Sequence, residues 1–246
     1  MKFIFHSATS RGTANHGWLQ ANHSFSFANY YNPEKMNFGA LRVLNDDLIA
    51  PSMGFGTHPH YNMEIITIPV SGLLKHKDSM GNVWEEVKAG EVQVMSAGTG
   101  IQHSEINGSA SEFLSLFQIW ILPNKNNVTP RYDQHYFEAL SDWELQVLVT
   151  SIDEETANKS LKIHQDAQIS RLNLARNTSF DYPVKSSRHG VYVMQIHGIS
   201  KINLTQLQSR DAIGISETDD FKIEAIEDSQ LLFIHAFQNS NDTGSE

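Results

Sequence analysis

Short apolar runs with a period of two residues recur along the chain, and this periodicity constrains the fold more than any other feature of the sequence. Residues 91–95, 146–149 and 191–194 alternate in this way, with valine as the recurring residue. Successive side chains of a strand point to opposite faces, so such runs indicate strands. Turn residues separate them at spacings of roughly 8–12 residues, which is typical of an all-β barrel or sandwich. Residues 154–161 and 204–210 each predict one or two helical turns.

The middle of the chain predicts a division into two halves. Residues 113–122 (FLSLFQIWIL) are almost continuously apolar, as expected of a strand that is covered on both faces. The following residues, 123–134, are polar and contain two prolines. Similar patterns begin at Val70 (VSGLLKHKD) and at Ile196 (IHGISKINL), one in each half. We therefore expect two related barrels, over residues 1–130 and 131–246.

Composition excludes several classes of function. The chain has 246 residues and no cysteine, which removes disulfides, thiolate nucleophiles and Cys-ligated metal sites. Its 18 basic and 28 acidic residues give a formal net charge of -10, which argues against nucleic acid or an anionic membrane as the main partner. No apolar stretch is long enough for a signal peptide or a membrane span. We expect a soluble, cytoplasmic protein.

Two pairs of polar residues have the spacing of metal ligands. His58 and His60 are two residues apart, as are His103 and Glu105, so within a strand each pair faces one side. Facing strands of a barrel would then bring three imidazoles and one carboxylate to one ion. Pro59 lacks an N–H and predicts an edge strand or a barrel mouth. Spacing alone also fits ordinary surface histidines beside glycine-rich turns.

The surroundings of these pairs resemble a known family. Residues 54–72 (GFGTHPHYNMEIITIPVSG) and 97–105 (AGTGIQHSE) are similar to the two cupin motifs of the pirin family. The resemblance covers most of the first 135 residues and is strongest to short bacterial pirin-like proteins described as quercetin 2,3-dioxygenases. Further matching segments are RGTANHGW (11–18), SFSFANYYNP (24–33), ALRVLNDD (40–47) and QIWILPNKNNVTPRY (118–132).

The resemblance implies a fold and a ligand set. The fold is all-β, a bicupin of two jelly-roll-like β-barrels with few short helices. In the family the two pairs ligate a metal, which here assigns His58, His60, His103 and Glu105 as ligands in the first barrel. The second barrel of the family is metal-free. In agreement, histidines of the second half are scattered, among them His164, His189, His197 and His235.

The resemblance also implies a reaction, namely metal-dependent dioxygenation of flavonols such as quercetin. The substrate would bind an open position of the metal through its 3-hydroxyl, with Glu105 accepting the hydroxyl proton, and the ring would open with release of carbon monoxide. We expect iron(II), with zinc, manganese, cobalt, nickel or copper as alternatives. The expected partners are a flavonol and O2, without nucleic acid or membrane, and we expect a monomer.

Two alternatives come from other functional classes. The first is an iron-binding regulatory pirin that acts as a redox-sensitive protein-interaction module and needs no substrate cavity. The second is a non-redox cupin, such as an isomerase, that works with zinc and without oxygen.

The sequence departs from the general cupin pattern at one position and adds a carboxylate at another. Ser52 stands where the general first motif has a glycine, six residues before the first histidine. Glu64 occupies the place of that motif's glutamate. Because the pirin carboxylate ligand comes from the second motif, we expect Glu64 to be structural or to support a ligand from behind.

Other polar and aromatic residues predict no chemistry. Asp46 and Asp47 are adjacent, so in a strand they face opposite ways and make poor acid–base partners. His76, between Lys75 and Lys77, predicts a solvated strand face, and His16 and His23 predict surface or hydrogen-bonded histidines. For the aromatic residues near the N-terminus we expect core or inter-barrel packing, with the lining of an aromatic substrate pocket as the alternative: Trp18, Phe25, Phe27, Tyr30 and Tyr31.

Overall fold

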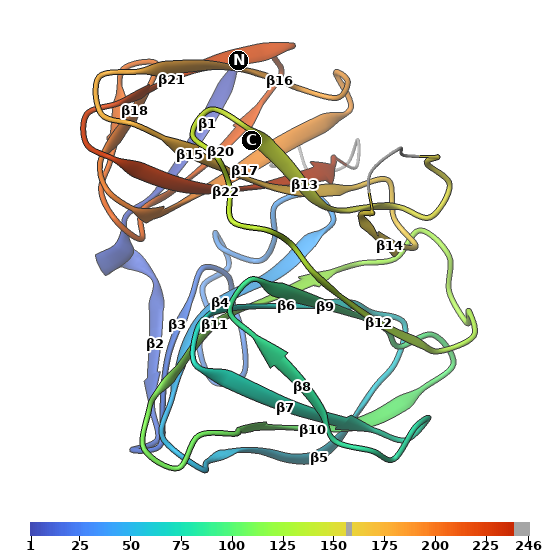
Figure 1. Cartoon of the computed structure of the whole chain (residues 1–246). Helices are drawn as coiled ribbons and strands as arrows, with labels where there is room; N and C mark the ends of the chain where they lie inside the picture. Colours follow the sequence, from blue (N-terminus) through green and yellow to red (C-terminus); the bar gives the residue numbers. More distant parts are fainter. Residues whose placement is uncertain (156–158, 239–246) are drawn as a thin grey trace.

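The structure is a computed structural model that describes residues 1–155 and 159–238. These residues form two stacked β-barrels, each built from a seven-stranded and a four-stranded sheet (Figure 1). The one helix among them is a 3-10 turn, η1 (Ala8–Ser10). The prediction of helical turns over residues 204–210 is wrong, because a short strand, β19, forms there instead. The other expected helical segment, 154–161, includes residues 156–158, which lie outside the described part.

The barrel that holds most of the N-terminal half has two walls. Its large sheet has, in spatial order, β12 (Arg131–Tyr136), β9 (Glu91–Ser96), β6 (Glu64–Ser71), β11 (Leu114–Ile121), β4 (Leu41–Ile49), β3 (Leu19–His23) and β2 (Gly12–Asn15). Its small sheet has the order β5 (Gly54–His60), β10 (Ile101–Asn107), β7 (Leu73–Asp78) and β8 (Glu85–Lys88). All pairings in this barrel are antiparallel.

The second barrel repeats this plan. Its large sheet has the order β1 (Lys2–His6), β20 (Ala212–Ser216), β17 (His189–His197), β22 (Ser229–Phe237), β15 (Gln168–Leu174), β13 (Leu145–Ser151) and β14 (Leu161–Ile163). Its small sheet has the order β16 (Ser179–Pro183), β21 (Asp220–Ala225), β18 (Ser200–Ile202) and β19 (Thr205–Leu207).

The faint repeat in the sequence corresponds to equivalent corners of the two barrels. Gly72, between β6 and β7, has φ 89°, and Gly198, between β17 and β18, has φ 82°. A Cβ at Gly72 would lie 2.8 Å from the carbonyl oxygen of Phe113, and one at Gly198 would lie 2.0 Å from that of Asp228. Both corners therefore need the conformational freedom and the small size of glycine.

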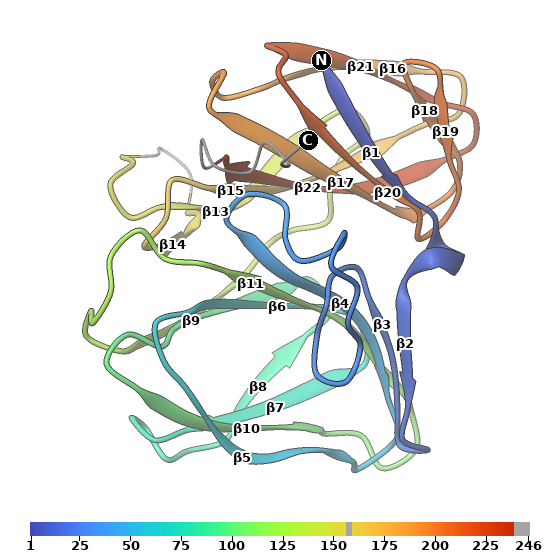
Figure 2. The same cartoon turned by 180° about the vertical axis from the view of Figure 1, so that it is seen from behind.

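Two strands cross the division that the sequence predicts at residue 130. The first strand, β1, pairs with β20 and so belongs to the sheet of the second barrel, where Figure 2 shows it at the edge beside β20. The strand β12 begins at Arg131 but pairs with β9 of the first barrel. The halves therefore exchange an edge strand each, which a boundary drawn from loop composition does not reveal.

An apolar layer fills the space between the two large sheets. It combines side chains from the outer face of β4, β6 and β11 with side chains from β17 and β22; examples are Leu44, Ile66, Phe117, Ile119, Tyr192, Met194, Leu232 and Ile234. The near-continuous apolar character of β11 follows from this position, because its other face lines the first barrel. The prediction that residues 113–122 form a strand covered on both faces is confirmed.

A partly buried ion cluster lies at the edge of this layer. Asp46 on β4 lies 3.3 Å from Arg11, and 3.5 Å from Arg210 of the second barrel. Arg210 also lies over the ring of Phe117, 5.0 Å from its centroid. The cluster ties the connection after β1 and the loop before β20 to the same carboxylate.

The interiors of the two barrels differ. The second is packed with apolar side chains, in which Tyr182 stacks on Phe233 at 4.2 Å and on Phe221 at 5.1 Å between ring centroids. The first has an apolar end and a polar end where histidines, carboxylates and amides are buried. The cavity described below opens in the first of these two interiors.

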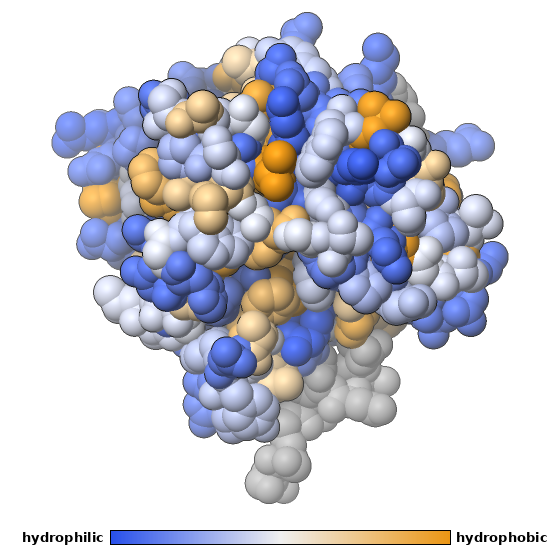
Figure 3. Space-filling model, turned by 90° about the horizontal axis from the view of Figure 1, so that it is seen from below, coloured by the Kyte–Doolittle hydropathy of each residue, from blue (hydrophilic) through white to orange (hydrophobic). Residues whose placement is uncertain are grey.

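The outer surface mixes polar and apolar side chains. In the view from below, hydrophobic residues lie in several patches between polar ones (Figure 3). Among the described residues, no helix is long and apolar enough to cross a bilayer.

The serine that stands in place of a glycine of the general cupin motif has a backbone conformation that favours glycine. Ser52 has φ 59°, in the left-handed region that disfavours a Cβ. We expect Ser52→Gly to raise the free energy of unfolding by up to about 1 kcal/mol, measured by urea denaturation. Ser179→Gly, in the exposed strand β16, is the matched control and should lower it by about 0.5–1 kcal/mol. A loss of stability in both variants would contradict the claim that the backbone at Ser52 is strained.

Candidate metal centre

The strands that carry the predicted ligands are direct neighbours. β5 is an edge strand of the small sheet, as Pro59 predicts, and it pairs with β10 so that His58 lies opposite His103. The register shifts by one residue between His103 and Glu105, a β-bulge of the kind that re-aims side chains beside functional sites. Gly54 permits this close pairing, because a Cβ there would lie 2.1 Å from the carbonyl oxygen of Glu105.

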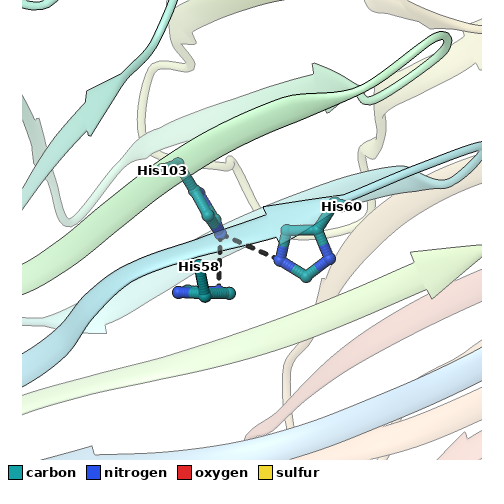
Figure 4. Close-up of side chains that lie close together, drawn as sticks. All are labelled: His58, His60 and His103. Atoms are coloured by element: carbon teal, nitrogen blue, oxygen red, sulfur yellow. Dashed lines mark hydrogen bonds between the residues drawn. The ribbon is translucent and has the colours of Figure 1, made fainter.

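Three imidazole rings converge inside the barrel (Figure 4). Nε2 of His103 lies 3.0 Å from Nε2 of His58 and 3.0 Å from Nε2 of His60. A single Nε2 has one hydrogen or one lone pair, so it cannot make two good hydrogen bonds at once. Two nitrogens each about 2.1 Å from a common ion, at a right angle, are about 3.0 Å apart. The three side chains therefore fit a metal ion better than they fit one another.

The protonation of these rings favours metal binding. Burial and, to a lesser extent, the neighbouring His58 lower the pKa of His60 to about 4 against an opposing effect of Glu105. Burial likewise lowers the pKa of His103 to about 4. Both rings are thus neutral at pH 7 and present lone pairs, as a metal requires.

Glu105 is within 4.8 Å of ligand atoms of His103 and His76 but is not part of the close group of His58, His60 and His103, and it is held from the opposite sheet. Its Oε2 accepts a 2.6 Å hydrogen bond from Gln118, and its Oε1 accepts bonds from Gln93 at 3.0 Å and Thr67 at 3.3 Å. Burial alone would raise the pKa of Glu105, but His76, His103 and Gln118 outweigh burial and lower it to about 2. A carboxylate has about four acceptor positions, so one on Oε2 is free for a metal or a proton.

His76 is a residue whose place the sequence interpretation gets wrong. It is 1 % exposed and points into the barrel, whereas a solvated strand face was expected. Its Nδ1 lies 3.9 Å from Oε1 of Glu105, and its ring stacks on Tyr132 with 4.7 Å between centroids. Together with His103 and Glu105 it forms a second group with metal-ligand chemistry, all within 4.8 Å. The signal was the period of two that continues inward from Leu74 to His76 and Asp78.

A cavity of about 290 Å³ opens beside the three imidazoles. This volume is at the lower end of the range for small-molecule sites, about 300–1,000 Å³. Both sheets contribute to its wall, which is largely apolar and aromatic away from the imidazoles; these apolar residues are Leu19, Ala21, Phe27, Phe55, Ile65 and Trp120. Such a wall fits a flat aromatic molecule that reaches the metal with a polar atom.

The far wall of the cavity, on β3 and β4, carries polar groups that the sequence interpretation did not assign to the site. His23 Nδ1 and Asn45 Oδ1 are 2.9 Å apart and satisfy each other. Asp47 is 4 % exposed, and its Oδ1 has no hydrogen-bond partner among the described residues. Burial raises the pKa of Asp47 to about 8, and the carboxylates of Asp46 and Glu105 act in the same direction. The prediction that Asp46 and Asp47 face opposite ways is confirmed.

The other residues considered at the sequence level have packing roles or lie at the surface. Phe25 packs between the barrels against Tyr192, Trp18 packs on Phe55, and Tyr31 is exposed, whereas Phe27 lines the cavity. Glu64 faces away from the cavity, and its Oε2 accepts a 2.7 Å hydrogen bond from Ser96. Of the two expectations for Glu64, the structural one fits this position.

Removal of a converging imidazole is expected to abolish metal binding. For His103→Ala the affinity for Ni(II) or Co(II) should fall at least about 100-fold, because the variant loses the ring nearest to both others. Titration calorimetry and metal content after gel filtration measure this loss. His16→Ala removes an exposed histidine and should bind as wild type does. Equal metal content in both variants would place the metal elsewhere.

The unpartnered carboxyl of Asp47 is expected to make stability depend on pH. Its pKa is about 8 in the folded protein and 3.8 ordinarily, so the folded state holds the proton more tightly and stability falls as pH rises from about 4 to about 8. Asp47→Asn has no ionisable group at this position, so its stability does not fall in this way as pH rises. Its stability advantage over wild type should grow by up to about 1.4 kcal/mol per pH unit, measured by urea denaturation of the metal-free proteins. An advantage that is constant with pH, or that the exposed-site control Asp142→Asn reproduces, would contradict this assignment.

Comparison with known proteins places this geometry in a family. Residues 5–121 match the family model described as Pirin, and residues 148–235 match the one described as Quercetinase C-terminal cupin domain. The chain is 46 % identical over 225 residues to a protein of Escherichia coli K12 named quercetin 2,3-dioxygenase, covering 92 % of this chain and 94 % of the relative. It is 41 % identical over 225 residues to a pirin-like protein of Caulobacter vibrioides, covering 92 % and 95 %.

Solved structures agree with the sequence relatives. The crystal structure of the bacterial pirin YhhW from Escherichia coli in complex with nickel(II) has a TM-score of 0.90 and 40 % identity, covering 97 % of this chain and all of that one. Another structure of YhhW has a TM-score of 0.91 and 41 % identity, covering 97 % and 99 %. The bicupin fold expected from the sequence is confirmed. With two cupin domains and three imidazoles converging beside a cavity in the first, this chain belongs to the pirin family.

Proposed function

We propose that this protein is a metal-dependent dioxygenase that cleaves flavonols such as quercetin. The observation that carries the proposal is the convergence of His58, His60 and His103 at the wall of an apolar cavity. Relatives that are 41–46 % identical over most of the chain and are named quercetin 2,3-dioxygenase, some as putative, support the substrate class.

The three imidazoles and Glu105 form the proposed ligand set. Imidazole and carboxylate ligands suit several first-row divalent ions, including the iron expected from the family and the nickel present in the relative's structure. A divalent ion held there would lower the pKa of a coordinated hydroxyl group and leave open positions for substrate and O2.

Glu105 is the proposed base. Gln93 and Gln118 hold the carboxylate from the large sheet, so its orientation does not depend on the metal alone. Its unused acceptor position on Oε2 can take the proton of a flavonol hydroxyl that lies against the imidazoles. A low pKa keeps Glu105 ionised at neutral pH, so its free position is available to the metal or, when the metal does not occupy it, to the proton.

The aromatic wall supplies binding and excludes water. Trp120 packs edge-on against His60, with 4.9 Å between ring centroids, and Phe27 packs against Trp120 at 5.3 Å. Phe55 lies on the other side of the site, 6.4 Å from His58. A planar flavonol held between such rings buries its apolar surface next to the metal ligands.

Oxygen consumption tests the function directly. Protein reconstituted anaerobically with Fe(II), and in parallel with Ni(II), is expected to take up O2 on addition of quercetin and to remove the flavonol absorbance. His58→Ala should show neither effect, because it lacks a ligand, while His16→Ala should behave as wild type. Absence of uptake by wild-type protein that demonstrably holds the metal would refute the dioxygenase proposal.

A further inference from the structure

Asp47 occupies an unusual position in the cavity wall. It lies on the inner face of β4, opposite Ala21 of β3 and Leu116 of β11, so its cross-strand neighbours are apolar. The side chain lines the cavity and is 4 % exposed, yet its Oδ1 has no partner among the described residues. A buried polar atom without a hydrogen bond is destabilising, so the folded protein carries a penalty at this position.

Nδ1 of His103 is also buried without a hydrogen-bond partner among the described residues, but other polar side chains of the cavity wall are paired. His23 and Asn45 hydrogen-bond each other, and Glu105 receives bonds from Gln93 and Gln118. On the outer face of the same strand, Asp46 faces Arg11 and Arg210. The two residues before Asp47 on β4 have partners elsewhere in the fold, whereas Oδ1 of Asp47 has none among the described residues. Its carboxyl group can therefore bind a group that enters the cavity.

The cavity wall around Asp47 indicates which kind of ligand fits the cavity. Asp47 is on the large sheet, whereas the imidazoles are on the small sheet, so the two polar ends of the cavity lie on opposite walls. Apolar and aromatic side chains line the space between them. The complementary ligand is therefore a flat aromatic molecule with a polar group at each of two separate places.

The protonation state of the Asp47 carboxyl group indicates which polar group of a ligand it would bind. Its raised pKa keeps Asp47 largely protonated at neutral pH, so it offers one O–H donor and one carbonyl acceptor. A hydroxyl group, which also donates and accepts, is its natural partner. Anionic ligand groups at this end would lack a neutralising cation.

We propose that Asp47 determines substrate specificity: its carboxyl group hydrogen-bonds a second hydroxyl of the substrate, remote from the oxygen that meets the imidazoles. This assignment rests on the proposed function. It specifies the substrate class as polyhydroxylated flavonols, which should bind more tightly than flavonols whose 3-hydroxyl is the sole hydroxyl group. Sites built to bond a hydroxyl discriminate strongly against analogues that lack it, because the buried group then stays unpaired.

Binding to the metal-loaded protein tests the assignment without turnover. Ni(II)-loaded full-length protein is titrated anaerobically with quercetin and with 3-hydroxyflavone, which keeps the 3-hydroxyl and the 4-carbonyl but lacks the other hydroxyls. Asp47→Ala is expected to weaken quercetin binding by about tenfold or more, and to change the Kd of 3-hydroxyflavone less than about twofold. Asp47→Asn keeps a donor and an acceptor and should retain most of the quercetin affinity.

Three results would overturn the assignment. The first is quercetin binding to Asp47→Ala as tight as to wild type, which would mean that water alone satisfies the carboxyl group. The second is an equal loss of affinity of Asp47→Ala for both flavonols, which would mean that Asp47 only shapes the cavity. The third is a melting temperature of ligand-free Asp47→Asn that is several degrees below wild type, which would show a structural partner.

The same titration separates this assignment from the proposed function. If wild-type protein binds quercetin and Asp47→Ala binds it equally, the role of Asp47 fails and the flavonol site stands. If Ni(II)-loaded wild-type protein binds neither flavonol, the proposed function fails, and the role of Asp47 fails with it. Asp142→Asn, at an exposed site, is the control and should match wild type with both ligands.

Discussion

The apolar layer between the two seven-stranded sheets is the constraint on which the rest of the structure depends. Its side chains come from both barrels, so neither large sheet is covered without the other. Burial of this layer fixes which face of β4, β6 and β11 turns outward, because a strand that slips by one residue would move its apolar set to the wrong face. The opposite faces of the same strands are then free to be polar, and they form one wall of the site.

The consequence is clearest at two adjacent carboxylates. The outward face of β4 places Asp46 beside Arg11 and Arg210, where it helps to hold the barrels together. The inward face places Asp47 in the cavity, where its Oδ1 has no hydrogen-bond partner within the described part of the chain. Identical side chains thus have opposite environments because the pleat alternates. Glu105 links the two walls, since it lies on the small sheet and accepts hydrogen bonds from Gln93 and Gln118 of the large one.

Much of the architecture follows from local patterns. Period-two alternation and turn spacing predicted an all-β fold, and the motifs around His58 and His103 predicted a cupin barrel. The convergence of His58, His60 and His103 follows from strand geometry once β5 and β10 are paired. The helical turn expected near residue 207 is wrong because the pairing of β19 with β18 outweighs a weak local preference. The exchange of β1 and β12 between the barrels is a matter of long-range pairing, which composition does not encode.

The sequence by itself determined the strand content, the doubled barrel, the absence of thiolate chemistry and the histidine pairs that suit a metal. Those properties depend on residue type and on short spacing, which are local. The tertiary structure alone decided that His76 is buried beside Glu105, that His23 and Asn45 satisfy each other, and that Asp47 is left unpaired in the wall of the cavity. Each of these depends on which strands lie opposite one another across a barrel, because hydrogen-bond partners there come from residues far apart in the chain.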